Sequence, residues 1–153
     1  MKRILAIDDS PEILTLVCLV LSARYTQLHS PGYPEFEVVT ATDGLTGINL
    51  FDKDGPFELV ITDLMISGNL SGSDTSGIDG HEIAQHIRQQ EEDTGKRTRI
   101  LLLSALSLEE CIEKYPEIQW LDLFDADFRV PFSTQELGDV VKKLVQGERT
   151  SDV

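Results

Sequence analysis

Short apolar runs recur along the chain, and an amphipathic stretch follows each one. The apolar runs are too short for helices and do not alternate polar with apolar residues, which is typical of strands buried on both faces of a parallel sheet. They are Ile4–Ile7, Phe36–Ala41, Phe57–Thr62, Ile100–Ser104 and Ala126–Val130. The amphipathic stretches, which predict helices, are Pro11–Arg24, Gly44–Asp52, Gly80–Glu92, Leu108–Tyr115 and Thr134–Gln146. Five alternations of strand and helix predict an α/β fold, a doubly wound five-stranded parallel sheet with helices on both faces.

The length of 153 residues fits a single domain. We expect this domain to span residues 1–147 and residues 148–153 to form a flexible polar tail. Two loops rich in Gly, Ser or Pro, Thr26–Pro34 and Asn69–Gly77, are longer than a compact connection requires. The second loop follows the third predicted strand, so it either governs access to the end of that strand or is a neutral surface insertion.

Charge and hydropathy exclude several classes of partner. The net charge is −14, with 13 Lys and Arg against 27 Asp and Glu, which argues against a nucleic-acid-binding face. The longest nearly apolar stretch, Ile13–Leu21, is nine residues long, whereas a membrane span needs about twenty. Two cysteines provide no disulfide framework and are compatible with a reducing compartment. The sequence therefore predicts a soluble cytoplasmic protein that binds neither nucleic acid nor membrane.

Three acidic residues stand at the ends of predicted strands. Ligands of open α/β sheets bind at the carboxyl ends of the strands, where the strand order reverses. In the flavodoxin-like order 2-1-3-4-5, this point lies between the first strand, which ends in Asp8-Asp9, and the third, which ends in Asp63. A role as helix caps explains them poorly, because Ser10 already precedes Pro11 and no helix begins soon after Asp63. We therefore expect the three carboxylates to converge.

Clustered carboxylates repel one another unless a cation neutralises them. Oxygen ligands completed by water and phosphate are the preference of Mg²⁺. Zinc fits poorly, because no Cys/His ligand spacing exists and His81 and His86 do not share a helix face. Ser104 ends the fourth predicted strand, where its hydroxyl could donate to a bound anion, and Ala105 leaves room for an incoming group.

The ordered stretches of this chain resemble the receiver (response-regulator) family of two-component systems. The resemblance covers nearly the whole chain, and the ordered set is specific although each motif alone is weak. The stretches that carry it are Ile4–Ser10, Thr40–Gly44, Leu59–Met65, Ile78–Gly80, Leu102–Ala105 and Val130–Phe132.

The resemblance implies a role for each residue of the site. Asp63 would be the phosphoacceptor, and it would contact Mg²⁺ directly together with Asp9. Asp8 would assist, often through water, and the backbone carbonyl of Met65 would complete the protein ligands. Ser104 would donate a hydrogen bond to the phosphoryl group. The donor would be a phosphohistidine on a histidine kinase or a phosphotransfer protein.

We therefore expect a stand-alone receiver that signals through a partner protein, since nearly every segment up to residue 147 belongs to the receiver pattern. It would be a phosphoacceptor signalling domain with self-catalysed, Mg²⁺-dependent phosphoryl transfer, not an enzyme. A phosphatase of the haloacid dehalogenase type would need a second Asp where this chain has Met65. A nucleotide-binding Rossmann protein would need a glycine-rich turn after the first strand.

Two departures from the family pattern leave a second reading open. The lysine that usually precedes the Pro-Phe of the fifth loop is Val130 here, and Arg129 stands one residue earlier. Strand alternation points Arg129 away from the site, although a local bulge could bring it back. The usual aromatic residue of the fifth strand aligns with Asp127, beside Phe128. The alternative is a degenerate receiver that acts as a phosphorylation-independent interaction module.

Overall fold

The computed structural model describes residues 2–21, 36–64, 79–130 and 134–145. The two long loops and the tail predicted from the sequence therefore lie wholly outside the described residues. The same holds for Met65, so its expected role as a metal ligand stays a prediction.

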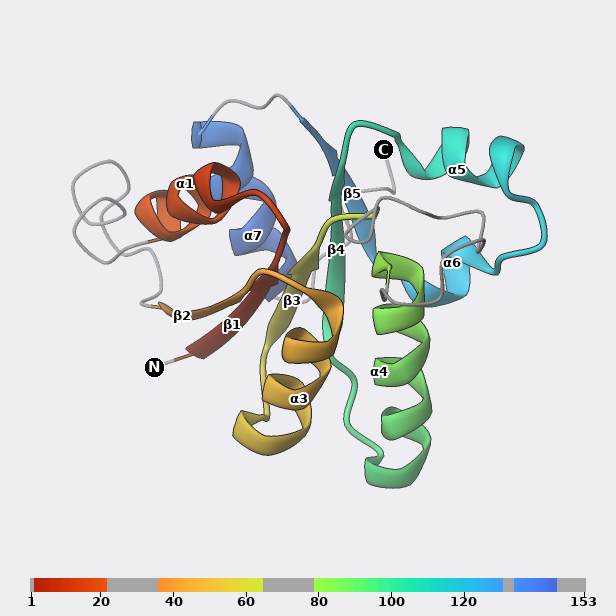
Figure 1. Ribbon diagram of the computed structural model, residues 1–153, viewed down its shortest axis with the longest axis horizontal. Coiled ribbons are helices and arrows are strands. Elements are labelled where there is room, and N and C mark those ends of the chain that lie inside the picture. The colour runs from red at the N-terminus through yellow and green to blue at the C-terminus, as the bar shows by residue number, and fades with distance from the viewer. Residues whose placement is uncertain (1, 22–35, 65–78, 131–133, 146–153) are drawn as a thin grey trace.

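Five parallel strands form one sheet in the order β2-β1-β3-β4-β5, as predicted (Figure 1). They are β1 (Lys2–Ile7), β2 (Phe36–Ala41), β3 (Leu59–Thr62), β4 (Arg99–Ser104) and β5 (Ala126–Arg129). In the register of the sheet, Ile7 lies beside Thr62, and Thr62 lies beside Leu102. The carboxyl ends of β1, β3 and β4 therefore meet along the same edge.

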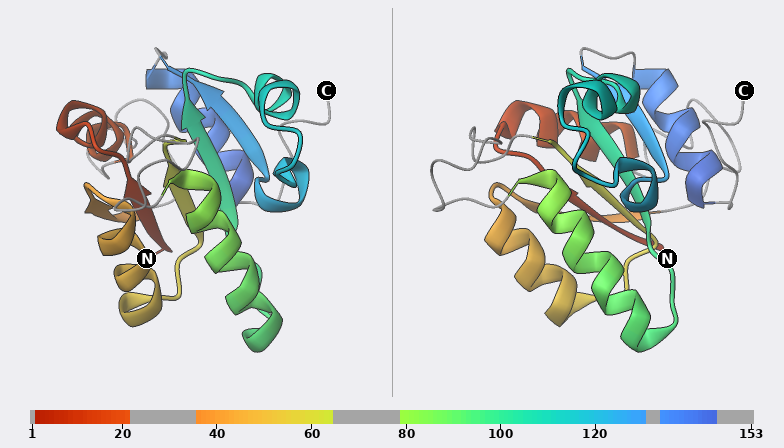
Figure 2. Two further views of the ribbon diagram at one scale, coloured as in Figure 1. Left: turned by 45° about the vertical axis from the view of Figure 1, so that its right-hand side comes forward. Right: turned by 90° about the vertical axis from the view of Figure 1, so that its right-hand side faces the viewer.

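Helices cover both faces of the sheet (Figures 1 and 2). They are α1 (Pro11–Leu21), α3 (Gly44–Asp54), α4 (Gly80–Thr94), α5 (Leu108–Lys114), α6 (Trp120–Leu123) and α7 (Thr134–Val145). Helices α1 and α7 bury their apolar side chains in one cluster, and α3 to α6 contribute to the cluster on the opposite face. None of these helices is long and apolar enough to cross a membrane.

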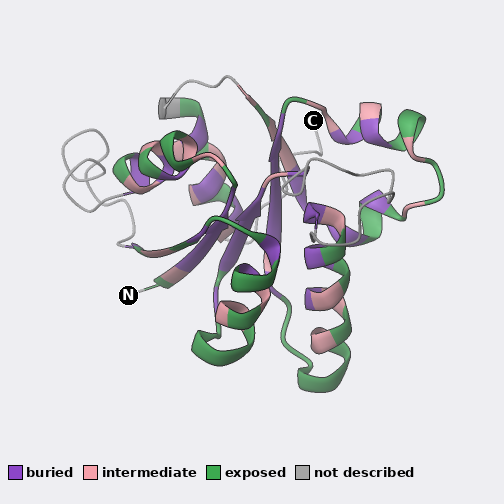
Figure 3. Cartoon of the chain, in the orientation of Figure 1, coloured by how far each residue is buried: buried purple, intermediate pink, exposed green. Residues whose placement is uncertain are grey.

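The three central strands are buried on both faces, as their continuous apolar runs predict (Figure 3). All four residues of β3 are buried, and β4 is buried throughout except for the half-buried Arg99. Strands β2 and β5 are partly exposed, so the expectation of burial on both faces is wrong for these two. Both are edge strands, which the helical layers cover less completely than the centre.

Helix α6 is an element that the sequence pattern does not predict. It lies between α5 and β5 and buries Trp120, whose side chain is among the largest that are fully buried. The Trp120 indole N–H donates to the carbonyl of Tyr115 at 3.0 Å, and its ring stacks on Phe124. One helical turn is too short to produce a readable 3.6-residue period, which explains why the pattern misses it.

Candidate functional site

The structure brings Asp8, Asp9 and Asp63 together at the carboxyl edge of the sheet. One carboxylate oxygen from each residue lies within 4.8 Å of the others. Asp8 directly follows β1 and Asp63 directly follows β3, and these strands are neighbours. Among the described residues, no histidine or cysteine joins a group of three potential metal ligands.

Backbone hydrogen bonds extend the sheet as far as the acidic residues. The Asp8 N–H donates to the Ala41 carbonyl at 3.1 Å, and the Asp63 N–H donates to the Ile7 carbonyl at 3.0 Å. The Asp63 carboxylate also accepts from the N–H of the next residue, Leu64, at 2.7 Å. The main chain is therefore fixed on both sides of the point where the carboxylates meet.

The loop that follows Asp8 starts helix α1. The Asp8 carboxylate accepts the Ser10 N–H at 2.9 Å, and the Ser10 hydroxyl accepts the Ile13 N–H at 3.4 Å. Ser10 therefore supplies the side-chain oxygen that faces the first turn of the helix, as its position before Pro11 predicts. The Asp8 carboxylate shapes the turn and faces the other two acids.

Burial and repulsion act together on Asp8, which is only 5% exposed. Its pKa is raised to about 7, chiefly by burial, and the Asp63 and Asp9 charges add to this while the Ser10 N–H opposes it. Asp9 is exposed and Asp63 is half-buried. A cation placed among the three oxygens would remove the repulsion, so the donor set suits a hard divalent ion.

A pocket of about 310 Å³ opens at this edge of the sheet. Its lining residues are Asp8, Asp9, Ser10, Ile13, Asp63, Leu103, Ser104, Ala105, Leu106 and Val130. Ser104 is buried, and its hydroxyl oxygen accepts the Leu106 N–H at 3.2 Å, which leaves the hydroxyl proton available to a bound anion. Ala105 is exposed at the rim, as its small side chain and position suggest. The lining set contains three carboxylates and no lysine or arginine among the described residues.

Val130 lines the pocket, whereas Arg129 is engaged at its rim. The Val130 N–H donates to the Ser104 carbonyl at 3.0 Å. The Arg129 guanidinium donates to the Ala105 carbonyl at 3.1 Å and pairs with the Glu110 carboxylate, also at 3.1 Å. The side chains of these two residues therefore diverge, in agreement with the alternation expected of a strand.

Asp127 has a role that the sequence does not reveal. Its carboxylate accepts the N–H of Leu108, the first residue of α5, at 2.8 Å. The neighbouring Phe128 packs instead against the apolar cluster on the α1 and α7 face. Residues 108 and 127 meet because β4 and β5 lie in register, and no local motif marks this contact.

Comparison with known proteins finds relatives and solved structures that align with nearly the whole chain. No protein-family model matches it. Two curated relatives, both described as "Probable transcriptional regulator ycf27", come from Cyanophora paradoxa and Porphyridium aerugineum. They are 29% and 27% identical over 146 residues, which is 95% of this chain and 48% of each relative. The chain thus spans about half the length of these relatives.

Solved structures of receiver proteins superpose along almost the entire chain. A response regulator receiver domain protein from Clostridium thermocellum has a TM-score of 0.62 at 18% identity and covers 96% of both chains. A response regulator receiver protein from Pseudomonas putida has a TM-score of 0.63 at 19% identity, over 93% of this chain and 96% of its own. Sheet order, helix arrangement and these likenesses agree with the resemblance found in the sequence. The chain has the fold of response regulator receiver domains.

Proposed function

We propose that this chain accepts a phosphoryl group on Asp63 from a phosphohistidine of a histidine kinase or phosphotransfer protein. The reaction depends on Mg²⁺, and the phosphorylated form signals through a partner protein. The observation that carries the proposal is the convergence of Asp8, Asp9 and Asp63 within 4.8 Å at the carboxyl edge of a receiver-type sheet.

Asp8, Asp9 and Asp63 would hold the Mg²⁺ ion. Their all-oxygen donor set and the raised pKa of Asp8, about 7, both fit a site that gains from a divalent cation. Bound Mg²⁺ supplies neutralisation of the negative charge on the transferred group. The backbone carbonyl of Met65, two residues after the acceptor, remains the predicted fourth protein ligand.

Transfer to Asp63 needs positioning and charge stabilisation but no further covalent chemistry. A carboxylate oxygen of Asp63 attacks phosphorus, the P–N bond of the phosphohistidine breaks, and the imidazole leaves with the electron pair. The product on this chain is an aspartyl phosphate. The Ser104 hydroxyl, which lines the same pocket, donates to a phosphoryl oxygen. The domain is a phosphoacceptor that promotes its own modification, not an enzyme that acts on a separate substrate.

Phosphoramidate tests the proposal, because it carries the same P–N linkage as phosphohistidine. With Mg²⁺ present, the intact mass of the protein should increase by one phosphoryl group, and chelation of the metal should prevent this. Asp63→Asn should remain unmodified, whereas Asp93→Asn, the same change on an exposed residue of α4, should be modified as fast as the wild type. Modification of Asp63→Asn at the wild-type rate would refute the assignment of the acceptor.

The degenerate receiver is the second candidate, and one observation favours it. Within the described residues, no lysine or arginine lines the pocket, and Arg129 is engaged with Glu110 and the Ala105 carbonyl. A protein of this kind would take up no phosphoryl group, and its binding of a partner would be unaffected by Asp63→Asn. The two candidates therefore differ in the mass measurement and in the sensitivity of partner binding to that substitution.

A further inference from the structure

Helix α4 begins in direct contact with the main chain of Asp63. Its first residue, Gly80, donates its N–H to the Leu64 carbonyl at 2.9 Å. A Cβ atom at Gly80 would overlap the carbonyl oxygen of Asp63 and would lie 3.0 Å from the Asp63 carbonyl carbon and 3.1 Å from the Leu64 Cα. The first turn of α4 therefore rests on the peptide that joins Asp63 to Leu64.

Only glycine permits this approach. The atoms that a Cβ would meet all belong to the main chain, so no side-chain rotation could relieve the overlap. Gly138 of α7 provides a contrast, because among the described residues a Cβ there would meet only the Val20 Cγ1 at 3.7 Å, an ordinary packing distance. Alanine should thus be tolerated at Gly138, whereas at Gly80 it requires the Asp63 peptide or the helix to move.

The contact also joins the two ends of the connection between β3 and α4. The chain leaves the site after Leu64 and returns at Asp79, which is only 2% exposed. The Asp79 N–H donates to the Glu82 carboxylate at 3.1 Å, which fixes the start of the helix. On the other side of the contact, the Leu64 N–H donates to the Asp63 carboxylate at 2.7 Å. Leu64 therefore links the start of α4 to the acceptor: its carbonyl accepts the Gly80 N–H, and its own N–H donates to the Asp63 carboxylate.

We propose that Gly80 is a positioning residue for Asp63: the start of α4, seated on the Asp63–Leu64 peptide, holds the acceptor carboxylate beside Asp8 and Asp9. The inference rests on the proposed function and adds the element that orients the acceptor.

The test compares Gly80→Ala with Gly138→Ala in the full chain. Far-ultraviolet circular dichroism and thermal unfolding establish that each variant is folded. Isothermal titration with Mg²⁺ should then show a loss of affinity of about 10-fold or more for Gly80→Ala, as for other residues that orient metal ligands. At saturating Mg²⁺, phosphoramidate should modify this variant on the order of 100-fold more slowly than the wild type. Gly138→Ala should match the wild type in both measurements.

A measurement on the wild type covers the case in which Gly80→Ala does not fold. Because coupling between two sites is reciprocal, a ligand on Asp63 must stabilise the start of α4 if that start positions Asp63. Mg²⁺ should therefore slow hydrogen exchange at the Gly80 amide more than at the Gly95 amide. The Gly95 amide, which donates to the Glu91 carbonyl at the other end of α4, is the internal control.

The outcomes separate this inference from the proposed function. A folded Gly80→Ala with wild-type Mg²⁺ affinity and modification rate would overturn the positioning role alone. Equal slowing of exchange at Gly80 and Gly95 in a wild type that binds Mg²⁺ would do the same. A wild type that neither binds Mg²⁺ nor accepts a phosphoryl group would overturn the proposed function and this inference together.

Discussion

Asp127 of β5 accepts a hydrogen bond from the backbone N–H of Leu108 at 2.8 Å and so joins the edge strand to the first residue of α5. Ser107 caps the same helix and forms a reciprocal capping box with Glu110. Glu110 in turn pairs with Arg129, which stands two residues after Asp127. Strand β5 therefore holds α5 through two of its side chains, those of Asp127 and Arg129.

Removal of the Asp127 carboxylate should loosen α5. Asp127→Ala leaves the Leu108 N–H without this partner, so we expect the free energy of unfolding to fall by about 1–2 kcal/mol. Relative to the wild type, the substitution should speed hydrogen exchange in α5 more than in α4. Chemical denaturation and exchange measurements test both effects, with Asp122→Ala, an exposed change in the neighbouring α6, as the control. Equal stability of the two variants would show that the Leu108 contact contributes nothing.

Much of the fold could be predicted because strand positions depend on local pattern. Strand β2 has the predicted bounds, and the sheet order is as expected. The predicted strand Phe57–Thr62 begins only at Leu59, although Phe57 is buried beneath it. The main chain of the exposed Glu58 still bonds to Arg3 and Arg99 of the neighbouring strands, so the difference lies mainly at Phe57, and an apolar pattern alone cannot separate burial from strand pairing.

The site was predictable only where it depends on strand ends. Asp8 and Asp63 follow neighbouring parallel strands, so alternation of strand and helix was enough to bring them together. The contacts of Gly80 with Asp63 and of Asp127 with Leu108 depend on how a helix docks and how two strands align. Such contacts join residues distant in sequence, and no local periodicity records them.

Mg²⁺ should stabilise the wild type by mass action, because it binds the folded carboxylate group and not the dispersed unfolded one. Thermal unfolding at millimolar Mg²⁺ should show a raised melting temperature. Asp9→Asn should lose most of this increase, since Asp9 is one of the three acids whose oxygens lie within 4.8 Å. Asp93→Asn, which removes the same charge from an exposed position on α4, should keep it. Equal stabilisation of wild type and Asp9→Asn would exclude the proposed metal site.

Phosphorylation should produce a weak conformational response, because Val130 supplies no cation to the pocket. A group shifts an equilibrium only through its differential interaction with the two states. Beryllium fluoride, a mimic of the acyl phosphate, should therefore cause small amide shifts in β4 and β5 of the wild type. Val130→Lys should enlarge these shifts. Arg129→Ala should leave them unchanged, since this guanidinium is held at Ala105 and Glu110. A large wild-type response that Arg129→Ala abolishes would show that Arg129 moves into the pocket.

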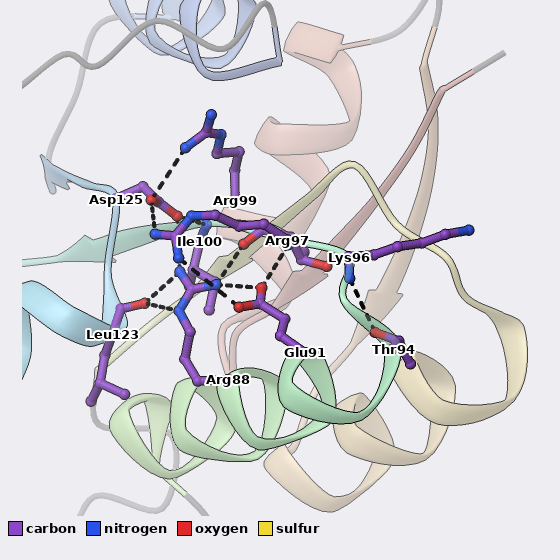
Figure 4. Close-up of polar contacts among 10 residues, drawn as sticks. Arg88, Glu91, Thr94, Lys96, Arg97, Arg99, Ile100, Leu123 and Asp125 are labelled. Carbon is purple, nitrogen blue, oxygen red and sulfur yellow. Dashed lines mark hydrogen bonds and ion pairs between the residues drawn. The ribbon is translucent and has the colours of Figure 1, made fainter.

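A buried network at the opposite edge of the sheet contributes to stability (Figure 4). The Asp125 side chain is 1% exposed. Its carboxylate accepts hydrogen bonds from the Arg88 guanidinium at 2.9 Å and from the Ile100 N–H at 2.8 Å. Arg97 donates to its other oxygen, and Arg88 also donates to the Leu123 carbonyl of α6. Burial alone would raise the pKa of Asp125, but the hydrogen bonds from Arg97 and Ile100 and the Arg88 charge together hold it below its ordinary value.

This network should make stability depend on acid pH. A carboxyl group whose pKa is lower in the folded than in the unfolded chain stabilises the fold above the unfolded value of 3.8. The contribution is lost as the pH falls through the folded-state pKa, below 3.8. At neutral pH, Asp125→Asn should lower the free energy of unfolding by about 1.5–3 kcal/mol, because it removes the charge that accepts from Arg88 and Arg97, while Arg88 keeps its ion pair with Glu91 at 2.6 Å. The difference from the wild type should narrow below pH 3.8, as the pH falls through the lowered pKa of the folded-state Asp125 carboxyl. Urea unfolding at a series of pH values measures this difference, with Asp122→Asn as the exposed control. If the difference in unfolding free energy stays constant at the lowest pH values measured, the lost stability comes from packing and not from the ionised carboxylate.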